Sequence, residues 1–306
     1  MTEHEFTLQD RIVKIRSINE LYDLENNAYI SFSGGKDSTV LHYLVDEALP
    51  GNKIPRVFIN TGIEYKAIIK FVKEMAANDN RFVTWTVGKD IKKTLQKVGY
   101  PFKSKEHSHK LFFWKNGSRC ISLKKYFNKA EGGFNTCPKK LMYQIEDDFK
   151  LNISDACCYE FKKKPIADYQ KQSGRSITMT GMMKAEGGQR TSLHCIVTDS
   201  KSGKVKKFHP LSVVSTEWET WYIAHKSIQL CLQIKAVWAT ATACASKIVR
   251  RIIKFAQLNT LEQYLPTERK RAELLWKPVY EEYRRIGYRL QKEDNQMSLF
   301  EGDMFK

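Results

Sequence analysis

The stretch NAYISFSGGKDSTVLHYL, residues 27–44, decides the fold. Its first part, Tyr29-Ile30-Ser31-Phe32, is typical of a buried strand, and the spacing of Val40, Leu41 and Leu44 is typical of a helix. Two adjacent glycines lie between these parts and permit a turn that residues with a Cβ would resist. The stretch therefore predicts a strand, a glycine turn and a helix in direct succession.

A turn of this kind suits an anion, because the first turn of the following helix points unpaired N–H groups into it. Lys36 adds a positive charge, and Asp37 could hold a Mg²⁺ that screens phosphate oxygens. An ordinary surface turn is the alternative. The residues of this stretch that we expect to bind a phosphate-bearing ligand are Ser31, Ser33, Gly34, Gly35, Lys36, Asp37, Ser38 and Thr39.

Residues 33–38, SGGKDS, resemble the PP-loop of the adenine-nucleotide alpha-hydrolase-like superfamily, in particular of the phosphoadenosine phosphosulfate (PAPS) reductase family. They are not a Walker A loop, since the GxxxxGK[ST] spacing is absent. The resemblance implies a HUP-like fold and an adenine nucleotide as ligand, either PAPS or its relative APS, or ATP.

Strands and helices alternate after this loop. Short strands are expected at 56–59 and 82–87 with a helix at 63–75 between them, and another strand at 177–180. Such alternation predicts an α/β fold with a doubly wound, mainly parallel sheet. We expect a nucleotide-binding domain over 1–225 with a basic insertion at about 99–150, a helical C-terminal extension over 226–290, and a disordered tail over 291–306.

The segment Asn60-Thr61-Gly62-Ile63-Glu64 follows the second strand and resembles the D-T-G-x-E segment of the family, with Asn60 in place of Asp. The resemblance implies that Asn60, Thr61, Gly62 and Glu64 line the adenosine pocket. A plain strand-to-helix turn is the alternative.

Residues 181–190, GMMKAEGGQR, are similar to the family's G-x-R-x-x-E-x-x-x-R element. Gly181, Glu186 and Arg190 match, whereas Met183 stands where the first Arg belongs and Lys184 could supply its charge only as a point charge. The resemblance implies nucleotide binding by Gly181 and catalytic roles for Lys36, Glu186 and Arg190. A simple i,i+4 ion pair between Glu186 and Arg190 is the alternative.

Cysteines raise the question of an iron–sulfur cluster. Cys157-Cys158 and the lysines after them resemble the cluster-bearing branch of the family, in which a Cys-x-x-Cys completes the four thiolates of a [4Fe–4S] centre. This chain has no CxxC and offers Cys231 and Cys244 instead, so the ligand set looks incomplete. Residues 232–256 read either as a frameshifted or degenerate segment or as a basic amphipathic helix.

The loosely patterned segment 99–133 carries His107 and His109 among several lysines. Two histidines at this spacing could bind a metal, but a mobile flap over an anionic substrate is the more natural expectation. Cys137 precedes an expected helix and could be a reactive thiolate at its N-terminus or a buried, inert thiol.

The net charge of +17, from 51 basic and 34 acidic residues, favours polyanions as partners, nucleic acid above all, against the alternative of a solvated basic surface. No apolar run is long enough to span a membrane, and the N-terminus lacks the pattern of a signal peptide, so we expect a cytoplasmic protein.

The expected function is that of a PAPS reductase-family protein in sulfonucleotide reduction or sulfur transfer. The first alternative is an ATP pyrophosphatase-type sulfurtransferase that acts on DNA or tRNA, and the second is a catalytically degenerate nucleotide-binding protein. No cysteine follows Cys244, so the mobile C-terminal nucleophile of sulfonucleotide reductases is absent. A thiol reductant or sulfur-donor protein and a second copy of the chain are further expected partners.

Overall fold

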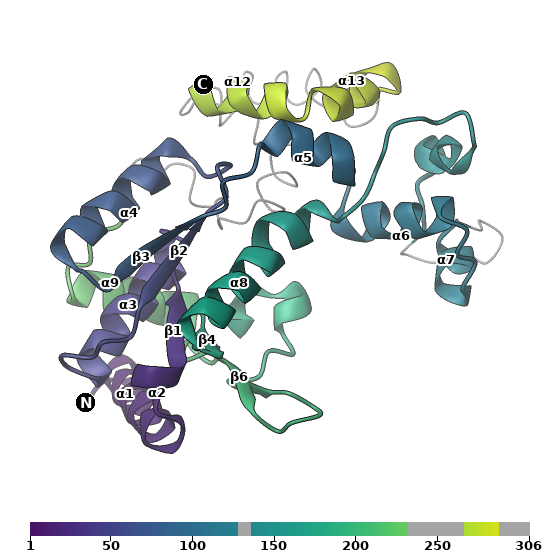
Figure 1. Cartoon of the computed structure of the whole chain (residues 1–306). Helices are drawn as coiled ribbons and strands as arrows, with labels where there is room; N and C mark the ends of the chain where they lie inside the picture. The colour runs from purple at the N-terminus through teal and green to yellow at the C-terminus, as the bar shows by residue number, and fades with distance from the viewer. Residues whose placement is uncertain (128–135, 232–265, 288–306) are drawn as a thin grey trace, which may run out of the picture. The chain divides into compact units, whose positions relative to one another are not determined.

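The structure, a computed structural model, describes residues 1–127, 136–231 and 266–287 (Figure 1). The chain divides into two compact units. The first comprises Met1–Val87 and Lys164–Ala236, and the second comprises Gly88–Lys163 and Val237–Lys306.

The first unit is built on a six-stranded sheet with the order β3-β2-β1-β4-β6-β5. Its strands are β1 (Ala28–Ser31), β2 (Arg56–Asn60), β3 (Phe82–Thr86), β4 (Ile177–Met179), β5 (Ile196–Thr198) and β6 (Val205–Phe208). All neighbouring strands run parallel except β5, which is antiparallel to β6. The predicted α/β fold with a mainly parallel sheet is therefore confirmed, and the β5–β6 hairpin was not predicted.

Helices cover both faces of this sheet. The helices of the first unit are α1 (Glu3–Tyr22), α2 (Leu24–Asn27), α3 (Lys36–Ala48), α4 (Lys66–Asn78), α8 (Lys164–Ser173) and α9 (Thr216–His225), with short 3₁₀ turns η4 (Lys184–Glu186) and η5 (Gly188–Arg190). Successive residues of a strand point to opposite faces, so Tyr29 packs edge-on against Tyr169 of α8, while Phe32 packs against His42 of α3. This coverage explains why β1 reads as an unbroken apolar run.

The order of the strands places β1 at the centre. The chain passes from β1 outward through β2 to β3 and then returns to β4 on the other side of β1. The loops that follow β1 and β4 therefore diverge at a topological switch point, which is where open α/β sheets bind ligands.

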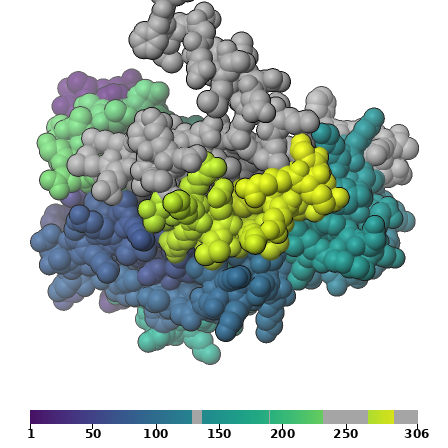
Figure 2. All heavy atoms as spheres, turned by 90° about the horizontal axis from the view of Figure 1, so that it is seen from above, coloured from purple at the N-terminus to yellow at the C-terminus, as the bar shows by residue number. Residues whose placement is uncertain are grey.

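The second unit is helical. Its helices are α5 (Ile91–Val98), α6 (Lys105–Lys115), α7 (Ile121–Phe127), the 3₁₀ helix η2 (Lys139–Ile145), the π-helical turn η3 (Tyr159–Lys163), α12 (Pro266–Leu275) and α13 (Lys277–Arg285). Tyr283 of α13 stacks on Phe102 at 4.4 Å between ring centroids, and its hydroxyl accepts a hydrogen bond from the backbone N–H of Lys103. Figure 2 shows α13, in yellow, lying against the teal surface of this unit. The residues of the expected basic insertion thus pack with the C-terminal helices.

No helix in the described parts of the chain is long and apolar enough to cross a lipid bilayer. The expected tail over 291–306 and the segment 232–256 lie outside the described residues.

Candidate functional site

The glycine loop follows β1 as predicted, and its own hydroxyl groups hold it in shape. Ser38 and Thr39 both donate hydrogen bonds to the carbonyl oxygen of Gly35, each at 2.9 Å, and Ser38 also accepts one from the N–H of Ser33. These two hydroxyls, which the sequence assigned to the ligand, are therefore engaged within the loop. Helix α3 begins at Lys36 with no side chain capping its N-terminus, which leaves the first-turn N–H groups for an anion.

Two glycines pack this loop against its neighbours. Gly34 has a φ of +70°, and a Cβ there would lie 2.8 Å from Cγ2 of Ile68 in α4. A Cβ on Gly181, just after β4, would lie 2.3 Å from the carbonyl oxygen of Asp37. The predicted site residues Gly34, Asp37 and Gly181 are thus brought together at the switch point, because only glycine permits approaches this close.

Glu219 is the residue of this site that the sequence did not reveal. It lies on α9, its side chain is fully buried, and its carboxylate forms an ion pair with the ammonium group of Lys36. Burial raises the pKa of Glu219, the neighbouring carboxylate of Asp37 raises it further, and Lys36 opposes the shift. In the sequence Glu219 looks like an ordinary acidic residue in the first turn of a helix, so no local signal could have identified it.

The side chains of Lys36, Asp37 and Glu219 thus lie together at the N-terminus of α3. Without a cation, the carboxylates of Asp37 and Glu219 would repel a phosphate group that approached Lys36. Mg²⁺ prefers oxygen ligands and commonly uses one or two carboxylates together with substrate phosphates. Asp37 and Glu219 therefore have the right chemistry to hold Mg²⁺ beside a polyphosphate.

Side chains of the segment after β2 form hydrogen bonds within that segment. Glu64 is buried and accepts hydrogen bonds from the backbone N–H of Thr61 at 2.9 Å and from its hydroxyl at 2.6 Å. The side-chain oxygen of Asn60 accepts a hydrogen bond from the N–H of Gly62. These contacts form a well-defined turn after β2, and the lining of an adenosine pocket by this turn stays a prediction.

The segment after β4 brings two predicted catalytic residues together. Glu186 and Arg190 form an ion pair, although they lie on the successive 3₁₀ turns η4 and η5 rather than on one α-helix. Met183 is buried in the core, while Lys184 is exposed and its N–H donates to the carbonyl of Ser212. The charge that Met183 lacks is therefore available in this segment from Lys184, since Arg190 is paired with Glu186.

The four cysteines considered as cluster ligands lie in different parts of the chain. Cys157 and Cys158 belong to the second unit, Cys231 belongs to the first, and Cys244 lies outside the described residues. A hydrogen bond with the adjacent thiol of Cys158, together with burial, raises the pKa of Cys157, and the thiol of Cys231 donates to the carbonyl of Ala67. Within the described ranges no third metal-ligating side chain gathers with Cys157 and Cys158. A four-thiolate cluster that also uses Cys231 and Cys244 stays a prediction.

The histidine-bearing segment is more ordered than the sequence suggested. His107 is fully buried in α6, where its Nδ1 accepts from the hydroxyl of Tyr126 and its Nε2 donates to Gln144. Burial lowers the pKa of His107 to about 4. His109 is exposed and faces Asp155 instead. A metal site built from both histidines is therefore wrong, because His107 is buried and His109 is exposed and faces Asp155. Apolar residues such as Leu111 anchor α6, and closure of this segment over a substrate stays a prediction.

Cys137 matches the alternative of a buried, inert thiol. Its side chain is buried, and the residues after it form the 3₁₀ helix η2 rather than an α-helix. A short 3₁₀ helix lacks the aligned dipoles that would stabilise a thiolate at an α-helix N-terminus.

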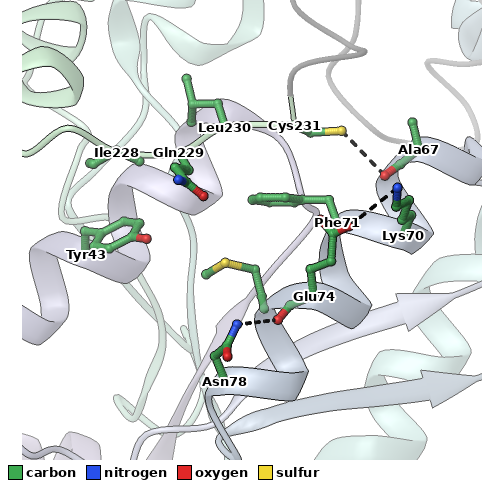
Figure 3. A pocket seen from close by; sticks show the side chains of 11 residues that line it. Tyr43, Ala67, Lys70, Phe71, Glu74, Asn78, Ile228, Gln229, Leu230 and Cys231 are labelled. Atoms are coloured by element: carbon green, nitrogen blue, oxygen red, sulfur yellow. Dashed lines mark hydrogen bonds and ion pairs between the residues drawn. The ribbon is translucent and has the colours of Figure 1, made fainter.

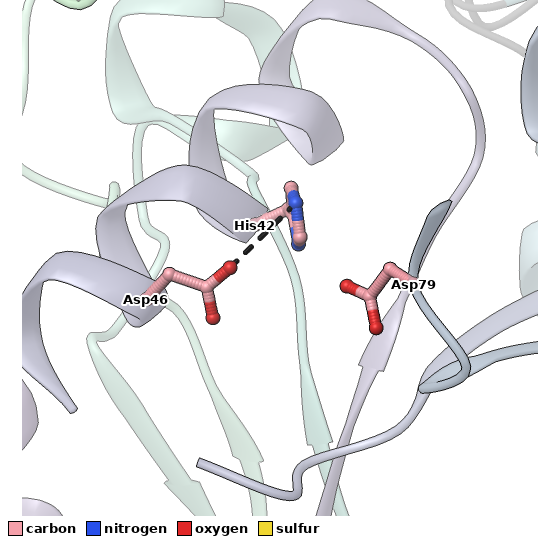
Figure 4. A group of neighbouring side chains, drawn as sticks. All are labelled: His42, Asp46 and Asp79. Carbon is pink, nitrogen blue, oxygen red and sulfur yellow. Dashed lines mark ion pairs between the residues drawn. The ribbon is translucent and has the colours of Figure 1, made fainter. Parts of the chain in front are cut away.

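Among the described residues, one group of three metal-ligating side chains gathers, and it lies at the amino ends of β2 and β3 (Figure 4). It consists of His42, Asp46 and Asp79. Asp46 accepts from both Arg56 and Arg81, and Asp79 accepts from Arg81 at 2.7 Å. Two guanidinium groups already neutralise the carboxylates, so the cluster is a structural charge network at the end of the sheet opposite the glycine loop.

A pocket of about 610 Å³ runs along the outer side of α4 (Figure 3). Tyr43, Phe71 and the segment 228–231 line it together with further residues of α4. None of its lining residues belongs to the loops after β1 or β4. It is therefore separate from the site at the switch point.

Comparison with known proteins identifies a family for this chain. The sequence profile of the phosphoadenosine phosphosulfate reductase domain matches residues 27–287. An uncharacterised protein of Methanocaldococcus jannaschii is 32% identical over 131 residues, which are 40% of this chain and only 30% of that protein.

Several solved structures are similar at low sequence identity. A PAPS reductase from Candida auris, solved as a phosphate complex, has a TM-score of 0.42 at 14% identity, over 71% of this chain and 80% of that chain. Yeast FAD synthetase in complex with FAD has a TM-score of 0.42 at 12% identity, over 77% and 65% of the two chains. An NH3-dependent NAD synthetase from Campylobacter jejuni has a TM-score of 0.41 at 10% identity, over 91% and 95%.

The profile covers most of the chain and includes the glycine loop, the segment after β4 and helix α9. The protein belongs to the phosphoadenosine phosphosulfate reductase domain family.

Proposed function

We propose that the first unit binds an adenine nucleotide with its polyphosphate on the glycine loop and cleaves it between the α- and β-phosphates. The observation that carries this proposal is the N-terminus of α3, where uncapped N–H groups and Lys36 lie beside the carboxylates of Asp37 and Glu219. A polyphosphate with its divalent cation satisfies all of these groups at once.

The role proposed for each group follows from its position at the N-terminus of α3. The N–H groups at the start of α3 donate to phosphate oxygens, and Lys36 neutralises the charge that develops as pyrophosphate leaves. Asp37 and Glu219 would hold Mg²⁺, which when bound screens the pyrophosphate oxygens. Lys184 and Arg190, on the adjoining segment, add positive charge on the side of β4.

The proposed reaction is an adenylyl transfer. An oxygen of the acceptor substrate attacks the α-phosphorus, the bond from that phosphorus to the bridging oxygen breaks, and pyrophosphate departs with the electron pair. The adenylylated oxygen is then a leaving group that sulfur could displace. This order needs no cysteine nucleophile.

Sulfonucleotide reduction is the second candidate, and membership in the PAPS reductase family favours it. In that reaction a thiolate attacks the sulfur of PAPS or APS, the bond from that sulfur to the phosphate oxygen breaks, and the adenosine phosphate leaves. A second thiolate then attacks the first thiol sulfur, which forms a disulfide and releases sulfite. Cys157 is a poor candidate for the attacking thiol, because its side chain is buried and its pKa is raised.

Product analysis separates the two candidates. Purified protein is incubated with Mg²⁺ and ATP labelled at the α-phosphate, or with PAPS and thioredoxin-type dithiol, each with and without nucleic acid. Formation of AMP and pyrophosphate supports adenylyl transfer, and release of sulfite supports reduction. Nucleotide binding without either product in any of these mixtures would contradict both reactions.

A further inference from the structure

The positive charge of the chain is concentrated in the second unit. The described residues of that unit, 88–163 without 128–135 and 266–287, carry 22 basic and 11 acidic side chains. The described residues of the first unit carry 20 and 17. The nucleotide-binding unit is therefore close to neutral, and a nucleotide alone does not account for the basic character of the protein.

Within the second unit the charge is denser still over α6, α7 and η2. We call residues 103–127 and 136–145 the basic module. It has a single acidic residue, Glu106, whose carboxylate accepts a hydrogen bond from Lys110 at 2.8 Å. Its nine basic residues are Lys103, Lys105, Lys110, Lys115, Arg119, Lys124, Lys125, Lys139 and Lys140.

Buried hydrogen bonds join the three helices of the basic module to one another. His107 links Tyr126 of α7 to Gln144 of η2 through its two ring nitrogens, at 2.9 and 2.8 Å. The ammonium of Lys110 lies over the ring of Tyr126 at 4.2 Å from its centroid. Because these contacts fix the three helices to one another, the exposed lysines are presented from a defined surface.

Four exposed lysines lack a compensating charge. Lys124 and Lys125 on α7 and Lys139 and Lys140 on η2 pair with no carboxylate in the described parts of the chain. Elsewhere in the same unit, Lys89 is paired with Glu160. An acidic turn, Glu146–Asp148, follows η2 and marks the limit of the basic surface. Uncompensated charges of one sign repel each other and are stabilised by a polyanion.

Aromatic rings stand among these charges. Phe113 is 41% exposed, and its ring lies 4.6 Å from that of His109. The guanidinium of Arg119 stacks on Trp114 at 4.1 Å. Lysines that follow a phosphate backbone and exposed rings that receive bases are the features that proteins use to bind single strands.

We propose that the basic module binds single-stranded nucleic acid, with phosphates on Lys124, Lys125, Lys139 and Lys140 and unstacked bases on Phe113 and the Trp114–Arg119 pair. A duplex keeps its bases stacked inside and would use only the lysines. This surface lies wholly in the second unit, and the inference goes beyond the proposed nucleotide chemistry, since it holds whether or not the first unit turns over a nucleotide.

Fluorescence anisotropy of labelled single-stranded DNA and RNA with the full-length protein, over a series of salt concentrations, tests the proposal. Replacement of Lys124, Lys125, Lys139 and Lys140 by alanine should weaken binding by about tenfold or more and reduce the slope of log K against log salt by about 3, since each phosphate contact on a single strand contributes about 0.7. The matched control replaces the exposed lysines Lys53, Lys73, Lys171 and Lys201 of the first unit and should leave the slope nearly unchanged.

Circular dichroism and thermal melting of each variant establish that it is folded. If the fourfold variant is unstable, the Lys139→Ala/Lys140→Ala pair should give about half of its change in slope. Equal loss of affinity in the first-unit control would mean that net charge alone drives binding and would overturn the proposal.

The aromatic part has its own test. Phe113→Ala should weaken binding of the single strand by about tenfold and leave binding of a duplex of the same sequence unchanged, because base stacking on an aromatic ring is lost only with unstacked bases. Tyr159→Ala, an exposed aromatic residue outside the module, is the control. Equal effects on single strand and duplex, no binding near physiological salt, or binding to vesicles of anionic lipid that the oligonucleotide cannot compete away would each overturn the proposal.

Discussion

The carboxylate of Glu219 lies buried against the ammonium group of Lys36, so helix α9 reaches the head of the glycine loop and supplies a counter-charge there. A nucleotide phosphate must therefore share Lys36 with a protein carboxylate. This relationship makes nucleotide affinity depend on Glu219 and on the divalent cation together.

Replacement of Glu219 by glutamine should change the dependence of ATP binding on Mg²⁺. Without Mg²⁺ the variant should bind ATP about tenfold more tightly than the wild type, because one negative charge near the phosphates is gone. With Mg²⁺ the gain should vanish, since the variant has also lost an oxygen ligand of charge −1. Isothermal titration with and without Mg²⁺ measures both affinities.

Glu217→Gln is the matched control, because Glu217 lies two residues earlier on the same helix and is exposed. It should leave both affinities unchanged. A Glu219→Gln variant that binds ATP more weakly than the wild type in the absence of Mg²⁺ would show that Glu219 orients Lys36 rather than competing for it.

The close approach of the segment after β4 to α3 predicts a severe effect of Gly181→Ala. The new Cβ would lie 2.3 Å from the carbonyl oxygen of Asp37, so the loop or the helix must move. We expect a loss of about 2 kcal/mol in the free energy of unfolding and a weaker affinity for ATP, measured by chemical denaturation and titration calorimetry.

Gly203→Ala in the β5–β6 turn is the corresponding control, because a Cβ there meets nothing within 4 Å. Its φ of +68° limits the expected cost to about 1 kcal/mol with no change in ATP affinity. Equal effects of the two substitutions on affinity would argue against contact between the two loops.

The sequence revealed the parts of this site that depend on local pattern. The glycine loop and the strands β1 to β4 are short apolar or glycine-marked segments, and each follows from a few consecutive residues. The hairpin of β5 and β6 was not predicted because its strands are brief: β5 is only Ile196-Val197-Thr198, and β6, Val205-Lys206-Lys207-Phe208, has two lysines at its centre. Such a segment has too little alternation to distinguish it from a loop.

The burial of Glu219 and of His107 could not be predicted from the sequence for a different reason. Each is a polar residue on a helix, and its burial results from contacts with residues distant in the sequence, Lys36 in one case and Gln144 in the other. Helical periodicity shows which face of a helix is apolar, but it does not show which polar residue will find a partner inside the protein.

Because His107 is buried, the free energy of unfolding should depend on pH. The pKa of His107 falls from its ordinary 6.5 to about 4 on folding, because burial disfavours the charged ring. Between these values the unfolded chain binds more protons, so the free energy of unfolding should decrease as the pH falls from 6.5 towards 4, by about 2 kcal/mol at pH 5 from this group.

Denaturant titrations at several pH values measure this dependence. His107→Gln should flatten the decrease below pH 6.5, while His109→Gln, an exposed histidine on the same helix, should not. An unchanged pH profile in His107→Gln would contradict a neutral, buried His107.

The charge network at the amino ends of β2 and β3 predicts that Asp46 matters for stability rather than for metal binding. Asp46→Ala leaves the fully buried Arg56 without its closest carboxylate and should lower the free energy of unfolding by about 2 kcal/mol. Asp168→Ala, at an exposed carboxylate on α8, should change it by less than about 0.5 kcal/mol. Added Zn²⁺ or Mn²⁺ should not raise the melting temperature through this group, and a rise that Asp46→Ala abolishes would show that it binds metal after all.

Binding of nucleotide phosphates by the glycine loop requires Lys36, and calorimetric titration of ATP with Mg²⁺ into the wild-type protein and into Lys36→Ala measures that requirement. We predict saturable binding to the wild type and affinity at least tenfold weaker in Lys36→Ala, with both proteins equally folded by circular dichroism. Equal affinity of the two proteins for the nucleotide would contradict this requirement.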